Sequence, residues 1–385
     1  MAQEKRQQVV PWFELFYDLI VVSVVVAAGK ILIGAPHWST ASFTATSLLL
    51  LLVLWLLTTL SYGLYRRNSP GRRLLLLAQM GALLIAALAA GEKGLPSAWG
   101  YAALGVAFAC AAGVYALHVR WDPTRSIPNR LVAAMCLVAA GYFVSVGNLL
   151  LGLFPSQSVT WSSAVLLVGL FVVLVPVAGP YLRCAIPRLD LHHLEERVGL
   201  VVIIVLGESF LALILRLSGQ PTIPSIPAFL LALAVPYCTW SLYFTGVINR
   251  DPPQRASLLR LWFAAHVLLV ISIATSATAI ADMTLIPFGT LDDTESPWSP
   301  LSTLGIAVGL LAVCGLAGIG DAASRVTFRA LTVAVVTIGA LLLINFLPSG
   351  PPRGPLFLAS SLTLVLCAIA VAILAPQPRD PVPSG

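Results

Sequence analysis

The chain has 385 residues, of which 58% are hydrophobic and only 10% are charged, and its mean hydropathy is +0.93. Ordinary soluble domains carry about a quarter charged residues, so a water-soluble globular protein of this length is excluded. A helix needs roughly 20 apolar residues to cross a bilayer. The composition therefore predicts an all-α, polytopic integral membrane protein that has the lipid bilayer as its partner and no large extramembrane domain.

Apolar runs bounded by charged residues, proline or glycine predict twelve transmembrane helices. In chain order the runs are 12–34, 42–65, 74–91, 97–118, 131–151, 161–182, 198–216, 226–248, 257–280, 300–319, 330–347 and 355–375. We expect residues 1–11 to form a cytoplasmic N-terminus, and the proline-rich residues 376–385 to form a disordered tail. Gly305 and Gly309 form a GxxxG pair, which predicts one close helix crossing.

The basic residues predict the orientation of these helices. Eighteen of the 22 lysines and arginines fall in alternate connections and at the two ends of the chain. By the positive-inside rule, both termini are then cytoplasmic. The net charge of +6 does not indicate a nucleic-acid partner, because the basic residues occur in short clusters between apolar runs.

The sequence also contains a weak internal repeat. Four residues at the end of the second predicted helix and in the connection after it recur at the end of the eighth and in the connection after that with a constant displacement of 183; the pairs are Gly63 and Gly246, Arg67 and Arg250, Pro70 and Pro253, and Arg72 and Arg255. This displacement predicts two parallel six-helix repeats. The first half would be 12–182 and the second 198–375, joined by a cytoplasmic linker at 183–197.

Two carboxylates lie in the first predicted helix. Glu14 and Asp18 are four residues apart, so they share one face, and Asp18 lies about 9 Å along the helix from Trp12 at a rise of ~1.5 Å per residue. Both residues are candidates for substrate binding or for proton or cation coupling. Alternatively, Glu14 complements the positive end of the helix dipole, and Asp18 pairs with a cytoplasmic arginine such as Arg67 or Arg250.

Two further ionisable residues are predicted deep within apolar runs. Counted from a helix start near Glu196, Glu208 lies about 18 Å along its helix, and His266 lies about 14 Å into another. A carboxylate at such a depth is typically a proton carrier, a cation ligand or half of a buried pair. We expect Glu208 to have a polar partner, either directly or through water, with Asp18, His266 or an arginine as the candidates. His266 is a candidate ligand or a hydrogen-bond link between helices.

Other motifs indicate little further chemistry. His193, Glu196 and Arg197 lie at a predicted cytoplasmic border and are interpreted as an interfacial ion-pair and capping segment, because their spacing does not match a known metal site. The six cysteines are scattered singly, which predicts neither a disulfide framework nor a zinc site. Nucleotide, dinucleotide and GxSxG hydrolase motifs are missing. The sequence thus predicts no metal and no cofactor.

Three segments in order along the chain carry a more specific signal. They are FELFYDLIVV at 13–22; His193, Glu196, Arg197, Gly199 and Leu200 followed by IIVLGES at 203–209; and Trp240, Tyr243 and Phe244 with His266. Together these segments resemble the signatures of the bacterial low temperature requirement protein A family. The resemblance implies a polytopic bacterial inner-membrane protein named for growth in the cold. It supplies no substrate or reaction.

The sequence leaves several functions open. Parallel repeats and intramembrane carboxylates favour a secondary transporter or permease-like protein, with Asp18 and Glu208 as the ionisable pair. One alternative is an intramembrane enzyme that acts on a lipid or isoprenoid-like substrate through the same carboxylates and His266. Another is a non-transporting membrane factor for growth in the cold. The substrate and the oligomeric state are not predicted.

Overall fold

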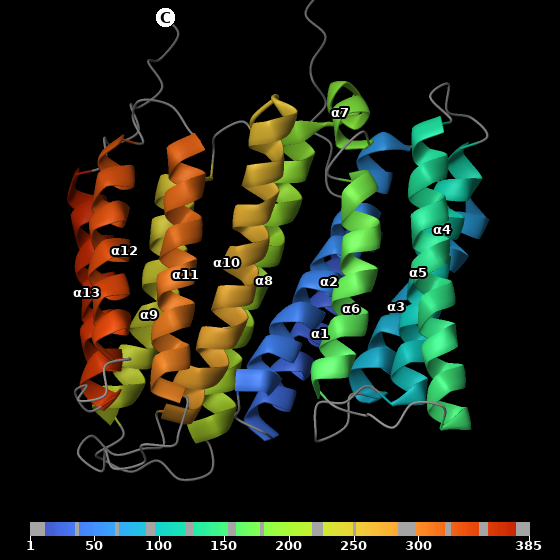
Figure 1. Cartoon of the computed structure of the whole chain (residues 1–385). Helices are drawn as coiled ribbons and strands as arrows, with labels where there is room; N and C mark the ends of the chain where they lie inside the picture. The colour runs from blue at the N-terminus through green and yellow to red at the C-terminus, as the bar shows by residue number, and fades with distance from the viewer. Residues whose placement is uncertain are drawn as a thin grey trace, which may run out of the picture. The chain divides into compact units, whose positions relative to one another are not determined.

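The computed structural model describes residues 12–34, 38–65, 69–89, 97–119, 126–152, 159–177, 181–217, 226–248, 252–283, 298–319, 325–345 and 353–374. Within these ranges the regular secondary structure is entirely helical (Figure 1). The prediction of an all-α chain is therefore confirmed for the described residues.

Twelve helices of at least 18 residues occur in these ranges, one on each predicted apolar run. They are α1 (Trp12–Gly34), α2 (Trp38–Leu64), α3 (Pro70–Ala89), α4 (Ala98–Val119), α5 (Ser126–Leu151), α6 (Val159–Pro176), α8 (Leu191–Leu217), α9 (Ile226–Gly246), α10 (Ala256–Met283), α11 (Trp298–Ile319), α12 (Arg325–Asn345) and α13 (Arg353–Leu374). The short helix α7 (Leu182–Ala185) and one 3-10 turn (Ile186–Arg188) lie between α6 and α8.

Eight of the described helices are long and apolar enough to cross a membrane, judged by length and composition. They are α2, α3, α4, α5, α8, α9, α10 and α11. Shorter apolar stretches lie in α6, α12 and α13. The chain is thus a multi-span helical protein, and the count of twelve spans stays a prediction.

Several helix ends differ from the predicted ones, and local sequence explains three of them. The α-helix predicted at 161–182 ends at Pro176, which lacks an amide hydrogen and so weakens the hydrogen bonding of the last helical turn. The one predicted from 198 begins at Leu191, because Asp190 caps it: the His193 backbone amide donates to the Asp190 carboxylate at 3.2 Å. Ser69 similarly caps α3, which begins at Pro70.

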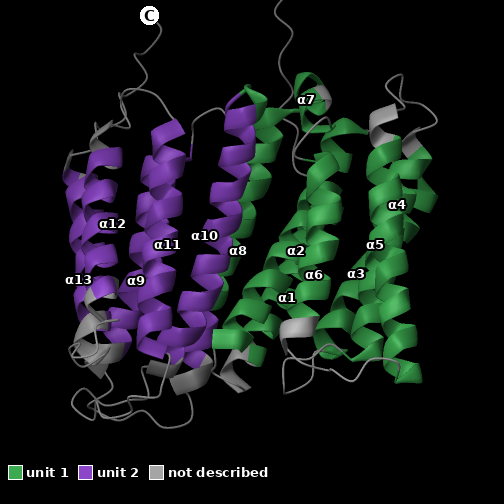
Figure 2. Ribbon diagram, viewed as in Figure 1, with its two compact units in different colours: residues 1–208, 254–256 green, residues 209–253, 257–385 purple. Residues whose placement is uncertain are grey.

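The chain divides into two compact units (Figure 2). Unit 1 comprises residues 1–208 and 254–256, and unit 2 comprises residues 209–253 and 257–385. The division therefore falls within α8, directly after Glu208. The predicted halves, 12–182 and 198–375, and their relation as parallel repeats stay predictions.

In unit 1, α2 forms the centre of the interior. It packs against α1, α4 and α6, and nearly all of its side chains from Leu48 to Ser61 are buried. A helix that is apolar on every side is suited to such a position. The few polar groups on α2 are consequently enclosed by other helices, and Trp55 and Thr58 are among them.

In unit 2, α9, α11 and α13 pack together, and α12 packs on α11 and α13. The predicted close crossing is present between α10 and α11. A Cβ atom at Gly305 would lie 2.7 Å from the Ser276 Cβ atom, and one at Gly309 would lie 2.8 Å from the Ser272 hydroxyl. At Gly305 the backbone of α10 also lies within 3.2 Å of this position, so a larger residue would require a shift of the neighbouring helix, whereas at Gly309 the Ser272 side chain would have to move.

Candidate functional site

The most strongly charged buried site lies in unit 1, between the N-terminal turns of α1 and α8. The Arg197 guanidinium donates from Nη1 to Glu14 Oε2 at 2.8 Å and from Nη2 to Asp18 Oδ1 at 2.7 Å. The three side chains are 0%, 4% and 0% exposed, respectively. One cation thus bridges two carboxylates in a site closed to solvent.

Local geometry explains this bridge. Four residues separate Glu14 from Asp18 in α1, so both carboxylates lie on one helix face about 6 Å apart along the axis. The guanidinium is a planar fork that offers several N–H donors in fixed directions. It can therefore direct one nitrogen to each carboxylate.

Two further side chains complete the bridge. The Trp55 indole Nε1 on α2 donates to Asp18 Oδ1 at 2.7 Å, and His193 Nε2 donates to Glu14 Oε2 at 3.1 Å. His193 precedes Arg197 by one helical turn, so α8 presents both residues to the same neighbour. We call Glu14, Asp18, Trp55, His193 and Arg197 the Arg197 cluster.

The Arg197 cluster keeps some hydrogen-bonding capacity. Asp18 Oδ2 and Arg197 Nε are buried and make no hydrogen bond to the residues that the structure describes. Buried polar atoms in folded proteins nearly always have a partner. His193 Nδ1 is likewise buried without a hydrogen bond to the described residues, so the cluster offers two acceptors and one donor to a water molecule or a ligand, and the acceptors can also take up a proton.

Ionisable side chains extend from this buried site to the protein surface. His192 is 71% exposed and lies 3.4 Å from the Glu196 carboxylate, which is 40% exposed. The other oxygen of Glu196 lies 4.0 Å from His193 Nδ1, and His193 is 12% exposed. Exposure thus falls stepwise along the first two turns of α8, from open solvent to the closed Arg197 bridge.

A second buried polar group joins α1, α2 and α3. Thr58 Oγ1 donates to the Leu54 carbonyl at 3.0 Å, and it accepts from the Tyr17 hydroxyl at 3.2 Å and from Gln79 Nε2 at 3.3 Å. Tyr17 adjoins Asp18 in the sequence. These bonds hold α1 beside α2 and fix the height at which Asp18 meets Trp55.

Arg72 is a buried cation that the sequence revealed only as a marker of orientation. Its guanidinium donates to the Tyr65 carbonyl and to the Ser61 hydroxyl. It lies over the Tyr62 ring, 4.1 Å from the centroid, as expected for a cation–π contact. Arg72 is 2% exposed, so it closes the end of unit 1 at which α2 passes to α3.

The sequence model of the bacterial low temperature requirement A protein (LtrA) matches residues 9–375, which is nearly the whole chain. The chain belongs to the LtrA family. No curated protein matches it. Together with the apolar helices, this membership identifies a multi-pass membrane protein of a bacterial family.

The geometry of the Arg197 cluster explains the charged residues in the two most specific family-like segments of this LtrA protein. The segment at 13–22 supplies Glu14 and Asp18, and the segment that begins at His193 supplies His193 and Arg197. Two segments that are about 180 residues apart in the sequence (|i−j| of 179 to 183) thus meet at one ion pair.

The partner of Asp18 is an arginine, as the alternative interpretation of the sequence predicts, but it is not one of the two given as examples. Asp18 binds Arg197 rather than one of the two arginines named from the sequence, Arg67 and Arg250, which both lie outside the described residues. Glu14 binds the same guanidinium. Within the predicted ion-pair segment, the His193 and Arg197 side chains point into unit 1, whereas Glu196 stays at the protein surface; the position of this segment at a membrane interface stays a prediction.

Glu208 lies apart from the Arg197 cluster. It is half-buried on α8 and makes no direct hydrogen bond or ion pair with the part of the LtrA chain that the structure describes. Eleven residues separate it from Arg197, which is about three turns, so the two side chains lie on one face of α8 about 16 Å apart. A partner reached through water stays a prediction.

His266 lies in unit 2, where it links α9 to α10. Its Nδ1 donates to the Trp262 carbonyl at 2.8 Å, and its Nε2 accepts from the Tyr243 hydroxyl at 3.0 Å. The Trp262 ring centroid is 4.1 Å from that of the imidazole. We call His266, Tyr243 and Trp262 the His266 cluster. Both of its ring nitrogens are occupied, as expected of a histidine that joins helices.

A metal centre is not evident in the described ranges. They contain no group of three or more histidine, cysteine, aspartate or glutamate side chains with a geometry that could hold a metal ion. The Arg197 cluster itself contains two carboxylates and an imidazole, which can exchange protons, and a guanidinium, which binds anionic groups.

Proposed function

We propose that this LtrA family protein is a proton-coupled secondary transporter or permease-like protein of the bacterial inner membrane, and that the Arg197 cluster is its proton-binding site. One observation carries the proposal: two buried carboxylates, Glu14 and Asp18, share a single guanidinium. From the distribution of basic residues, we further propose that both termini, and with them the cluster, lie on the cytoplasmic side.

The charge balance of the Arg197 cluster supports this role. With both carboxylates ionised and His193 neutral, the cluster carries a net charge of −1. An uncompensated charge in a buried site is costly, so one additional proton on either carboxylate brings the cluster to neutrality. Gain and loss of that proton change the attraction between α1 and α8, which is how a proton could drive a conformational change.

A route for the proton also supports the proposal. Glu196 and His193 form steps of decreasing exposure between solvent and Glu14. Histidine is suited to such a step because one ring nitrogen can accept a proton while the other releases one. His193 is thus proposed as the entry point to the carboxylates.

Glu208 is proposed as a second carboxylate on the transport path. It lies on the same face of α8 as Arg197, about 16 Å further along, and its lack of a direct partner among the described residues leaves it free to bind a proton or a cation. In this proposal Asp18 and Glu208 act at different depths along one helix face. Transfer of a proton or a cation between Asp18 and Glu208 depends on solvent or substrate between them.

The first experiment measures protonation directly. Infrared difference spectra of the purified protein, recorded between acidic and alkaline buffer, should contain a carboxylic-acid carbonyl band that is lost in Asp18→Asn or Glu14→Gln. His193→Gln should slow the appearance of this band after a pH jump, whereas His192→Gln, at the exposed neighbouring position, should not. A spectrum without such a band, or with the same band in both carboxylate variants, would overturn the proposal.

The second experiment measures proton movement. Proteoliposomes with a trapped pH-sensitive dye are given a potassium gradient and valinomycin, and proton flux is compared between wild type and Asp18→Asn. Wild-type flux should exceed that of protein-free vesicles, and the variant should lose it. If wild type shows no flux with sodium, potassium or an amino-acid mixture present, the transport proposal fails and a non-transporting membrane factor is the better description.

A further inference from the structure

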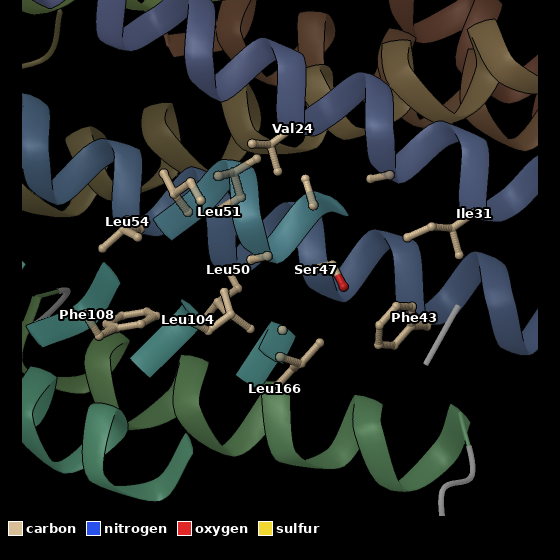
Figure 3. A pocket seen from close by; sticks show the side chains of 15 residues that line it. Val24, Ile31, Phe43, Ser47, Leu50, Leu51, Leu54, Leu104, Phe108 and Leu166 are labelled. Atoms are coloured by element: carbon tan, nitrogen blue, oxygen red, sulfur yellow. The ribbon is translucent and has the colours of Figure 1, made fainter. Parts of the chain in front are cut away.

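An elongated pocket lies within unit 1, between α1, α2, α3, α4 and α6 (Figure 3). It has a volume of about 80 Å³. On the usual requirement of roughly 10–15 Å³ for each water molecule, this space could hold about five to eight waters. The pocket is therefore large enough for a ligand fragment and is not a mere packing defect.

The lining decides what the pocket can hold. Of the side chains that line it, Ser47 is the single polar one, and the others are aliphatic, aromatic or glycine. A buried water molecule needs two to four polar partners, and cavities with apolar walls stay dry or take up apolar molecules. The walls thus favour a hydrocarbon over water.

The shape favours a chain over a compact molecule. Phe43 and Ile31 lie at one end of the pocket in Figure 3, and Leu54 and Phe108 lie at the other. From Phe43 to Leu54 the lining extends along eleven residues of α2, which is about 16 Å at the rise of an α-helix. A linear hydrocarbon chain matches this length.

Ser47 adds one polar contact to the pocket. Its neighbour Thr46 donates to the Ser42 carbonyl at 2.8 Å, as hydroxyls in helices commonly do. The Ser47 hydroxyl makes no hydrogen bond to the residues that the structure describes. It points toward the pocket in Figure 3, so it is available to a polar group on the ligand.

We infer that this pocket is a binding site for the linear hydrocarbon chain of an amphiphile, with Ser47 as a hydrogen-bond donor or acceptor for its polar part. The same chemistry is offered by an acyl chain of a membrane phospholipid and by a free single-chain amphiphile such as a fatty acid. The inference does not depend on the Arg197 cluster or on proton movement.

Photolabelling tests the site. The purified full-length protein is irradiated with a fatty acid that carries a diazirine in its chain, and labelled peptides are identified by mass spectrometry. Label should concentrate on peptides from α2 and α4 that line the pocket, and excess oleate should displace it. Label spread over the exposed helix faces, with no displacement, would overturn the inference.

A pocket-filling variant sharpens the test. Ala87→Phe should reduce labelling by about tenfold, equivalent to a loss of ~1.4 kcal/mol in binding, and Ala28→Leu, a lining residue on α1, should also reduce it. Ala140→Phe adds the same bulk on an exposed face of α5 and should leave labelling unchanged. Thermal unfolding curves identify any variant that fails to fold. Equal labelling of folded Ala87→Phe and wild type would contradict the site.

Native mass spectrometry distinguishes the two possible sources of the hydrocarbon chain, a membrane phospholipid and a free single-chain amphiphile. A phospholipid that remains bound to wild type after detergent exchange, and is lost from Ala87→Phe, assigns the pocket to the bilayer. A bound single-chain amphiphile assigns it to a free ligand. If neither is retained and added oleate does not bind, the inference fails, whatever the result of the proton measurements.

Discussion

The Arg197 cluster of unit 1 and the His266 cluster of unit 2 both bury a histidine among helices, yet their chemistry differs. In the Arg197 cluster, His193 contacts a carboxylate that already shares a guanidinium. In the His266 cluster, the imidazole contacts a backbone carbonyl and a phenol. The first site must balance full charges, whereas the second satisfies neutral donors and acceptors.

This difference indicates that the chemistry of a buried histidine depends more on the group it contacts than on how deeply it is buried. His266 is 3% exposed, but its two hydrogen bonds can both be made by a neutral ring. His193 is slightly more exposed and lies beside charge that one proton can neutralise. A site for reversible protonation is therefore better sought at the Arg197 cluster, and variants at both sites can test this comparison.

The largest effect is expected for Arg197→Gln. Removal of the guanidinium leaves two buried carboxylates without a cation, and breaking a buried ion pair typically costs about 3–5 kcal/mol. We expect little folded protein, measured by yield and by thermal unfolding in detergent. Arg183→Gln is the matched control, because Arg183 is exposed on α7 and should be neutral.

A rescue variant distinguishes the effect of uncompensated charge from the effect of lost packing at the Arg197 cluster. Glu14→Gln and Asp18→Asn, combined with Arg197→Gln, remove all three charges and should recover much of the folded protein. If the triple variant is as unstable as Arg197→Gln alone, the cost does not come from uncompensated charge, and the electrostatic contrast between the two clusters is wrong.

The next largest effect is expected for Trp55→Phe. Hydrogen bonds to charged groups contribute about 1.5–3 kcal/mol, and this variant removes the indole N–H from Asp18. Unfolding in denaturant should show a loss of this size. Trp99→Phe, at a side chain that is 76% exposed, should be nearly neutral. An equal loss in both variants would assign the effect to the smaller ring.

A smaller effect is expected in the His266 cluster. Tyr243→Phe leaves His266 Nε2 buried without its donor, which costs about 1–3 kcal/mol. His266→Leu should remove most of this penalty, so the two substitutions should be non-additive in a double-mutant cycle by about 0.5–3 kcal/mol. Proton flux should persist in the folded variants. Loss of flux without loss of stability would give His266 a functional role.

The smallest effect on stability is expected for Glu208→Gln. Glutamine retains the shape of the side chain, and Glu208 has no direct partner among the described residues, so the change should stay within about 0.5 kcal/mol. Proton flux should nevertheless be abolished, because the amide binds no proton. A loss of folded protein comparable to that of Arg197→Gln would instead indicate a structural carboxylate.

Most of the helical architecture could be predicted because apolar runs and their boundaries are local signals. The exact residues at which the helices begin and end were harder to predict. The N-terminus of α8 depends on the Asp190 cap, and without it His193 and Arg197 were placed in a linker at 183–197. A search for a capping residue at this position would have placed both side chains on the helix.

The site was only partly predictable, for a different reason. Spacing in α1 placed Glu14 and Asp18 on one face, but spacing cannot reveal a partner 179 residues away. Arg197 was therefore interpreted as interfacial, and Arg67 and Arg250 were named as examples of the arginine that Asp18 could pair with. The roles of Trp55, Thr58 and Arg72 were missed as well. Aromatic and hydroxyl side chains in helices, and basic residues at helix ends, are common in membrane proteins and do not by themselves indicate a site.

The long sequence separation within the Arg197 cluster has a consequence for biosynthesis. The ribosome adds Arg197 179 residues after Asp18, which is roughly 9–36 s later at about 5–20 residues per second. During that interval α1 carries two carboxylates without their guanidinium. The nascent protein must therefore keep this helix at the translocon, at the membrane surface or in a protonated form until α8 emerges and completes the pair.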